Sequence, residues 1–298
     1  MIKNVTLTGV LIASLGLTSA NAQIKIGDKA LSAVSKGFSA LTFSDADAAN
    51  LAREAIAQMD KENTVAPDSD PYAMRLNRLF GKHKNENGLV LNYKVYKKNE
   101  INAFACADGS VRVFEGLMNV MDDNQLLAVI GHEIGHVANH DTRDAMKEIY
   151  KKEAAIDAAA SQSKKVEKMT ESQLAKIGSA MYDSHYSRKQ ESEADIYSYK
   201  FMKRNGYNVN AVESAFTILA KLGAGPSNII DQMMSSHPDA ATRALNSKAR
   251  AEADGLYKPY VQQPIVNTVP QPAAKTTTAT TAKKTTTAKK TTTTTKKK

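Results

Sequence analysis

The sequence predicts an α+β fold that is mostly helical. Apolar residues recur at helical spacing through most of the region 45–253, whereas the stretch 89–97 alternates apolar and polar residues as a half-buried strand does. With 298 residues, the chain is long enough for one substantial domain with its own core. Its single cysteine, Cys106, permits no intrachain disulfide, so the fold must be held by packing. We expect Cys106 to be a small buried side chain rather than a reactive thiol.

The first 22 residues are typical of a cleaved secretory signal peptide. Lys3 supplies a positive charge, residues 5–17 form the apolar stretch, and Ala-Asn-Ala at 20–22 is a small-x-small cleavage pattern. The apolar stretch is short for a membrane anchor, and no later segment approaches a spanning length. We therefore expect a soluble protein that is periplasmic or otherwise exported, with no transmembrane segment in the mature chain. An uncleaved anchor is the alternative.

The region before the central motif is expected to hold two helices and three short extended pieces. Ser44 is a favourable N-cap for the first helix, and Asp70 followed by Pro71 is typical of the start of the second. The dipeptide Asp108-Gly109 predicts a turn between two extended pieces. The predicted elements are helices over 45–61 and 72–82, a strand over 89–97, and two extended pieces within 102–114.

A predicted helix over about 123–140 carries the motif His132-Glu133-Ile134-Gly135-His136. Residues four apart lie on one face of a helix, so the two imidazoles can hold one metal ion while Glu133 projects toward the water that the metal polarises. This pattern is typical of zinc proteases. The alternative is a core helix with two hydrogen-bonded histidines.

His140 is a poor candidate for a further ligand to the same ion. It lies eight residues after His132, which is about 12 Å along a straight helix. The metzincin pattern, which has a glycine and a third histidine at fixed positions after the motif, is also missing: position 139 is Asn and position 142 is Thr. We expect His140 to lie on the surface or to support a ligand.

The third ligand is expected from a second helix, over about 186–205. Glu191 and Asp195 are one turn apart and share a face. One of them can bind the metal while the other orients a histidine ligand through its free N–H. Glu193 points away from both and is the weaker candidate. The residues alone leave open which of the two acids is the ligand.

The remaining parts of the chain are predicted as helices and a disordered tail. Residues 141–180 are charged and rich in alanine, which indicates a mostly exposed helical excursion; a solvated hairpin is favoured over a substrate lid. Further helices are expected over 210–222 and from Pro238 to about 253. From Pro259 to the C-terminus, the Pro, Gln, Thr, Ala and Lys composition predicts disorder.

The net charge of the chain is concentrated in the tail. Residues 265–298 hold eight lysines and no acidic residue, so the tail and Lys3 account for the formal charge of +9 and leave the body near neutral. The folded part therefore offers no electrostatic basis for nucleic-acid binding. The tail is expected to be a solubilising segment, and weak contact with anionic envelope components is the alternative.

Several motifs occur in a fixed order along the chain. They are Asn102-Ala103-Phe104-Ala105, Glu115-Gly116-Leu117, Gly131 to His136, Glu191-x-Glu193-Ala194-Asp195, and Ser236-His237-Pro238 with Arg243. Together they resemble the family of zinc metallopeptidases that contains HtpX, the CAAX prenyl endopeptidase and the periplasmic β-barrel assembly-enhancing protease. The resemblance covers roughly 70–250. The membrane helices of HtpX and of the prenyl endopeptidase and a helical repeat domain are not expected here, and Cys106 and Asp108 stand where relatives often carry Pro and Gly.

The resemblance implies roles for the residues at these positions. It implies a zincin-like domain over 23–258 that binds one Zn²⁺ through His132, His136 and Glu191. Asp195 is then expected to support a histidine ligand, and Arg243 to pair with a carboxylate such as Asp195. It further implies a sheet edge lined by the region 102–114, where we expect Asn102, Ala103 and Phe104 to contact substrate.

A mechanism follows from these parts. Glu133 is expected to take a proton from the attacking water and to deliver it to the leaving amine. His237 is expected either to donate a hydrogen bond to the developing oxyanion or to bind the zinc and hold the enzyme shut. The alternative is a loop histidine that has no role in the site. An extended substrate is expected to pair with an edge strand near Ser110 to Phe114, which would favour unfolded chains.

The sequence therefore predicts an exported zinc metalloendopeptidase that acts on unfolded or misassembled envelope proteins. The quality-control role rests on the resemblance alone. The alternative is an autoinhibited or non-catalytic assembly or binding factor that keeps the metalloprotease fold. The presence of Glu133 argues against a catalytically silent protein.

Overall fold

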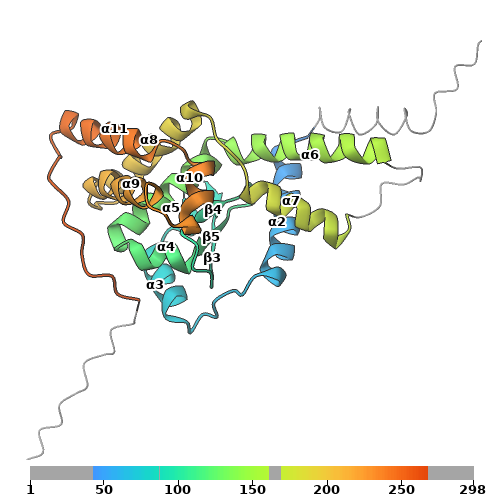
Figure 1. Ribbon diagram of the computed structural model, residues 1–298, viewed down its shortest axis with the longest axis horizontal. Coiled ribbons are helices and arrows are strands. Elements are labelled where there is room, and N and C mark those ends of the chain that lie inside the picture. Colours follow the sequence, from blue (N-terminus) through green and yellow to red (C-terminus); the bar gives the residue numbers. More distant parts are fainter. Residues whose placement is uncertain (1–42, 87, 161–168, 268–298) are drawn as a thin grey trace, which may run out of the picture.

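The computed structural model describes residues 43–86, 88–160 and 169–267, and the predicted mostly helical α+β fold is confirmed (Figure 1). The predicted signal peptide and residues 268–298 of the predicted tail lie outside the described residues. None of the helices in the part of the chain that the structure describes has the length and apolar character needed to cross a bilayer.

The helices follow the predicted order closely. Ser44 and Asp70 cap the first two as expected, by accepting hydrogen bonds from the backbone N–H groups of Asp47 and Tyr72. Three very short helices, α4, η1 and α10, were not predicted. The helices are α2 (Asp45–Glu62), α3 (Pro71–Phe80), α4 (Glu115–Val120), α5 (Asp123–Ala138), α6 (Asp141–Ala160), α7 (Glu171–Tyr182), α8 (Arg188–Arg204), α9 (Asn210–Gly223), η1 (Asn228–Ile230), α10 (Asp231–Ser236) and α11 (Ala240–Ala253).

The strands form a three-stranded sheet and a separate hairpin. In the sheet, β3 (Asn92–Tyr96) pairs in parallel with β5 (Ser110–Phe114), and β4 (Ala103–Ala105) pairs antiparallel with the other side of β5. The predicted strand 89–97 is divided, because its start, β2 (Leu89–Val90), pairs instead with β1 (Asn85–Glu86).

The order of the strands corrects one prediction. Because β5 lies in the middle of the sheet, the backbone from Ser110 to Phe114 is already paired on both sides and is not an edge. The edge that lies beside α5 is β4. An extended substrate that adds to this edge must therefore pair with residues 103–105.

Helices cover both faces of the sheet. In Figure 1 the strands lie between α8, α9 and α11 on one side and α2, α6 and α7 on the other. Val95 and Val113 belong to the larger apolar cluster with α5, whereas the neighbouring Tyr96 and Phe114 belong to a second cluster with α2. The predicted alternation along the strand thus separates two buried faces rather than a buried face and a solvated one.

The segment predicted as a mostly exposed excursion contains α6 and α7. Met146 on α6 and Ile177 on α7 are buried, and they pack in the second cluster beside Tyr96, Phe104 and Phe114. The two helices therefore form part of the layer that covers the sheet. Residues 161–168, between them, lie outside the described part of the chain.

Residues 256–267, which we call the C-terminal strap, lie against the domain. The predicted tail begins at Pro259, yet Tyr260 donates a hydrogen bond to the Asp122 carboxylate, as does the backbone N–H of Gln263. Farther along, Asn267 accepts a hydrogen bond from Arg75. The strap was missed because hydrogen bonds hold much of it in place, although Tyr257 and Tyr260 also pack against the larger apolar cluster.

Candidate metal centre and active site

Two glycines allow α5 and α8 to approach closely. A Cβ atom at Gly135 would lie 3.0 Å from both Ala194 Cα and Tyr197 Cβ, and one at Gly131 would lie 3.0 Å from the Phe201 ring. Such contacts are tighter than ordinary carbon–carbon contacts, so a larger residue would push the helices apart. This spacing brings the side chains of α8 within reach of the histidines on α5.

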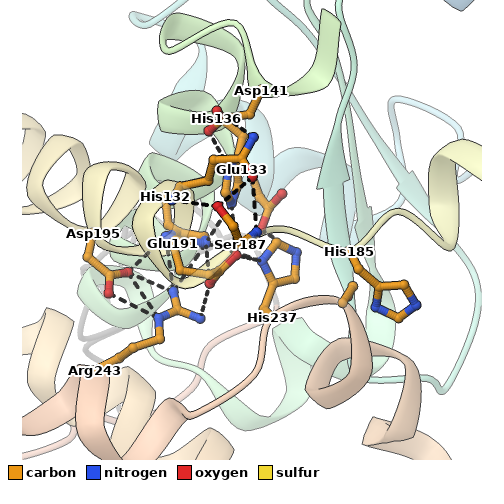
Figure 2. Close-up of polar contacts among 12 residues, drawn as sticks. His132, Glu133, His136, Asp141, His185, Ser187, Glu191, Asp195, His237 and Arg243 are labelled. Carbon is orange, nitrogen blue, oxygen red and sulfur yellow. Dashed lines mark hydrogen bonds and ion pairs between the residues drawn. The ribbon is translucent and has the colours of Figure 1, made fainter. Parts of the chain in front are cut away.

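The structure brings His132, His136 and Glu191 together, as Figure 2 shows. The two Nε2 atoms are 3.1 Å apart. Glu191 Oε1 lies 3.3 Å from His136 Nε2, and Glu191 Oε2 lies 3.5 Å from His132 Nε2. All three side chains are buried. The predicted third position is therefore filled by Glu191, the first acid of the pair on α8.

A separate carboxylate orients each imidazole. His132 Nδ1 lies 2.9 Å from Asp195, and His136 Nδ1 lies 2.9 Å from Asp141. Because a carboxylate only accepts hydrogen bonds, each Nδ1 carries the proton and each Nε2 presents a lone pair. Burial, together with the nearby Arg243, lowers the pKa of His132 to about 3, which keeps that imidazole neutral.

Arg243, on α11, joins the two acids of α8. Its Nη1 lies 2.5 Å from Glu191 Oε2 and its Nη2 lies 2.7 Å from Asp195 Oδ1. The predicted pair with Asp195 is confirmed, and the pair with Glu191 is an addition. Burial acts to raise the pKa of Glu191, but the electrostatic attraction of the surrounding imidazoles and the hydrogen bonds of His136 and His237 outweigh it and hold this pKa well below its usual range. Glu191 is therefore ionised.

Glu133 is buried in an environment that favours its neutral form. Burial raises the pKa of this carboxyl to about 7, and a hydrogen bond from the backbone of Ala105 opposes the rise. Its Oε1 has no hydrogen-bond partner among the described residues and lies 3.6 Å from His237 Nε2. A carboxyl with a pKa near neutrality can both accept and release a proton under physiological conditions.

His237 follows α10 and reaches into the same cluster. Its Nδ1 lies 2.9 Å from Glu191 Oε1 and 3.3 Å from His132 Nε2. The potential ligand atoms of His132, His136, Glu191 and His237 all lie within 4.8 Å of one another. His237 thus stands where a fourth ligand would stand.

The edge strand β4 presents its backbone beside this cluster. The N–H groups of Phe114 and Cys106 bond to the carbonyls of Asn102 and Ser110, so residues 102, 104 and 106 face β5. By the alternation of an antiparallel pair, the backbone of residues 103 and 105 faces the open side. The Asn102 side chain accepts a hydrogen bond from the N–H of Ala103. Phe104, in contrast, directs its side chain into the second apolar cluster.

Two residues of the site were not predicted. Asp141 was missed because it follows the end of α5, and the left-handed backbone of His140 (φ 66°) returns it to His136. Tyr186, to which no role was given, stacks its ring on His136 with centroids 3.8 Å apart. The His140 side chain itself is 57 % exposed, in agreement with the prediction that it binds no metal with His132.

The geometry fits a divalent cation. Two imidazole lone pairs that face each other at 3.1 Å repel unless a proton or a cation lies between them, and both Nδ1 protons are already committed to carboxylates. Two nitrogens and one ionised carboxylate are a donor set that zinc prefers, although other divalent ions also accept it. His132, His136 and Glu191 are the residues that would hold the ion.

Two histidines one turn apart, a buried acid between them and a glutamate from a second helix define a metalloprotease of the gluzincin type. The comparison with known families agrees: the model of peptidase family M48 matches residues 77–251. The chain belongs to this family, and it is a metalloendopeptidase.

The chain is also similar to individual bacterial proteases. It is 39% identical to the metalloprotease LoiP of Escherichia coli over 227 residues, which are 76% of this chain and 89% of LoiP. It is 38% identical to the metalloprotease YcaL of the same organism over 222 residues, which are 74% of this chain and 86% of YcaL. A protein of Vibrio cholerae named "Putative beta-barrel assembly-enhancing protease" is 29% identical over 165 residues, which are 52% of this chain and 33% of that protein.

Proposed function

We propose that this metalloendopeptidase is exported, uses zinc, and hydrolyses peptide bonds in unfolded or misassembled envelope proteins. The observation that carries the proposal is the convergence of His132, His136 and Glu191 beside the buried Glu133. Two of these side chains have the protonation state that their roles require, since His132 is neutral and Glu191 is ionised. Hydrogen bonds to Asp141 and Glu191 outweigh burial and raise the pKa of His136, so a cation that binds its Nε2 must displace a proton from there when this imidazole is charged. A bound zinc ion would lower the pKa of a water molecule toward neutrality and polarise the peptide carbonyl.

The other steps, which are proton transfer and the positioning of the ligands, are carried out by side chains of the protein. Glu133 accepts the proton of the attacking water and delivers it to the amine that leaves, for which its pKa of about 7 is well placed. Asp195 and Asp141 hold the two imidazoles in the tautomer that presents Nε2. Arg243 fixes the carboxylates of Glu191 and Asp195 and so sets the position of α8 side chains in the cluster.

The substrate binds as an extended strand along the open side of β4. The backbone of Ala103 and Ala105 faces this side. Their N–H groups already bond to Asn102 and Glu133, so an added strand would bond to the two carbonyls, irrespective of sequence, or displace these contacts. Asn102 contacts the substrate strand through its side-chain amide. Phe104 supports the position of β4, because its side chain packs in the second apolar cluster. Because only extended chain can pair in this way, unfolded segments and termini are the expected substrates.

Two observations support the proposal that the protein acts in the cell envelope: the signal-peptide pattern at its N-terminus and the name of one relative. Residues 1–22 have the pattern of a secretory signal peptide, and one relative carries a name that refers to β-barrel assembly. We place the mature protein in the periplasm and assign it to the quality control of exported proteins. We assign the basic tail a solubilising role, and weak contact with anionic envelope components is the alternative.

One experiment tests the proposal directly. Purified protein, loaded with zinc and measured for metal content, is incubated with unfolded casein beside the variant Glu133→Gln. Hydrolysis by the wild type but not by the variant, at equal zinc content, supports the proposal. Equal inactivity of both forms, with binding of an envelope partner, would instead favour a non-catalytic assembly factor.

An autoinhibited enzyme is the second candidate, and the position of His237 favours it. The catalytic cluster is buried, and His237 Nδ1 lies among the potential ligand atoms. With His237 as a fourth ligand, a four-coordinate metal ion would have no free position for water or for the substrate carbonyl. The short α10 is attached to its surroundings by hydrogen bonds from His185 to Ser235 and from Gln232 to Tyr182, and these must rearrange before a peptide enters.

A further inference from the structure

A small cavity lies beside the catalytic cluster, between the end of β4 and the helices α6 and α7. Its wall is built mainly from small or flexible apolar side chains, among them Ala105, Ala107, Ala145, Met146 and Met181. The volume open to the centre of a water molecule is about 10 Å³, which is room for one water molecule. A methyl or hydroxymethyl group is therefore the largest group that enters without movement of the wall.

Two residues connect this cavity to the reacting groups. The ring of Tyr186, which lines the cavity, stacks on His136 at an interplanar angle of 13°. Ala105, also in the wall, ends the open edge strand, and its backbone hydrogen-bonds Glu133. A peptide paired with β4 directs alternate side chains to opposite faces of the sheet. The side chains on one of these faces therefore point toward α6, where the cavity lies.

The wall of the cavity contains a polar group that lacks a partner. Thr142, in the first turn of α6, is 7% exposed, and its Oγ1 makes no hydrogen bond within the ranges 43–86, 88–160 and 169–267. A buried hydroxyl that has no hydrogen-bond partner destabilises the protein. A ligand that supplies a hydrogen-bond partner for this hydroxyl therefore gains affinity. A substrate hydroxyl of the right length would do so.

We infer that this cavity is the pocket for the side chain of a small substrate residue, alanine or serine, next to the cleaved bond, and that Thr142 recognises serine. The inference rests on the proposed function, because the pocket selects among substrates of that same site. Alanine fills the space with its methyl group, and serine adds a hydrogen bond to Thr142 Oγ1. Leucine and larger residues are excluded unless Met146 or Met181 moves.

The test uses the zinc-loaded full chain and peptides that vary at the positions flanking the cleaved bond. The wild type is expected to require alanine or serine at one fixed position. Thr142→Val, which keeps the shape of the side chain and removes the hydroxyl, should lower kcat/KM for serine relative to alanine by about 2- to 12-fold. Met181→Ala, which widens the cavity, should raise kcat/KM for leucine relative to alanine by about tenfold or more.

Controls separate the pocket from general effects of mutation. Met74→Ala removes the same side chain from an exposed position on α3 that does not line the cavity, and it should leave the preference unchanged. If Met181→Ala does not fold, Ala107→Leu fills the cavity from its partly exposed rim and should lower kcat/KM for serine peptides. Binding of the same peptides to Glu133→Gln, followed by fluorescence anisotropy, should reproduce the order of preference.

The outcomes distinguish the two proposals. If the wild type hydrolyses casein but shows no preference for a small residue, the pocket is refuted and the proposed function stands. The pocket is also refuted if folded Met181→Ala and Thr142→Val keep the wild-type preference. If the wild type and Glu133→Gln are equally inactive on every substrate, the proposed function fails and the pocket with it.

Discussion

At the scale of single residues, the position of His237 determines whether the site is open. Its Nδ1 lies 2.9 Å from Glu191 Oε1, and its Nε2 lies 3.6 Å from Glu133 Oε1. A histidine that only donated to an oxyanion would leave the Glu191 carboxylate free. The observed contacts instead favour a side chain that competes with substrate for the metal.

We therefore expect His237→Ala to hydrolyse unfolded casein faster than the wild type, by roughly threefold to tenfold, because the fourth position becomes free. Initial rates at equal zinc content measure this. His140→Asn is a suitable control, because it removes an exposed imidazole and Asn tolerates the left-handed backbone. A loss of activity by about a hundredfold in His237→Ala would show that His237 stabilises the transition state instead.

The sequence predicted the residues whose chemistry is local. His132, Glu133 and His136 follow from helical spacing, and the pair Glu191 and Asp195 follows from the same rule. Asp141 could not be found in this way: residues 136 and 141 do not share a helix face, and only the end of α5 and the turn at His140 bring them together. Tyr186 has no sequence signal, since its role depends on a loop conformation.

At the scale of elements, the distance between α5 and α8 determines whether a metal can be held. The candidate ligands come from both helices, and Gly135 is one of the residues that set the separation of the helices. The helices themselves were predictable from caps and periodicity. Their close packing was not, because a glycine at one position carries no information about its partner helix.

Gly135→Ala is expected to reduce zinc affinity by about tenfold or more, because the new methyl group pushes α8 away and Glu191 with it. Titration with a competing chelator measures the affinity. Gly178→Ala in α7 is the matched control: its new Cβ would meet only the flexible side chain of Met59 and the more distant Ala55 carbonyl. Unchanged zinc affinity in Gly135→Ala would contradict this account of the helix packing.

The sheet is attached to α2 by a partly buried ion pair. Arg112 on β5 donates to both oxygens of Asp60, and Lys94 donates to one of them. Burial raises the pKa of Asp60, but the hydrogen bonds of Arg112 and Lys94 outweigh it, so the pKa is lower in the folded state. The order of the strands that creates this pair could not be predicted, since it depends on contacts between distant segments.

The lowered pKa of Asp60 predicts a dependence of stability on pH. The stabilisation is fully present above the unfolded-state pKa of about 3.9 and is lost as the pH falls through the lower folded-state value. Asp60→Asn should therefore be less stable than the wild type at pH 7, and the difference should narrow below about pH 4. Urea unfolding at both pH values measures it, with the exposed Asp68→Asn as control. A difference that does not change with pH would contradict the assignment.

At the scale of the whole molecule, the C-terminal strap connects parts of the domain that are distant in sequence. Tyr260 and Gln263 bond to Asp122, whose carboxylate also caps α5, and Gln262 bonds to Val120 and Gln125. The strap therefore holds the start of the helix that carries the histidines. Its composition predicted disorder, because sequence patterns register apolar burial more readily than polar anchoring.

Truncation tests the strap. A chain that ends at residue 267 should unfold at the same temperature as the full chain, whereas one that ends at 258 should lose about 2–4 kcal/mol of stability through the removed hydrogen bonds. Thermal and urea unfolding of the zinc-free proteins measure this. Equal stability of the two truncated chains would show that the strap contributes nothing to the fold.

The central claim is that one zinc ion is held by His132, His136 and Glu191, and a crystal structure of the zinc-loaded protein with anomalous data at the zinc edge tests it most directly. We predict one strong anomalous peak about 2.0–2.1 Å from both Nε2 atoms and about 2.0–2.2 Å from the Glu191 carboxylate. A peak elsewhere in the molecule, or one from which Glu191 is absent, would contradict the account.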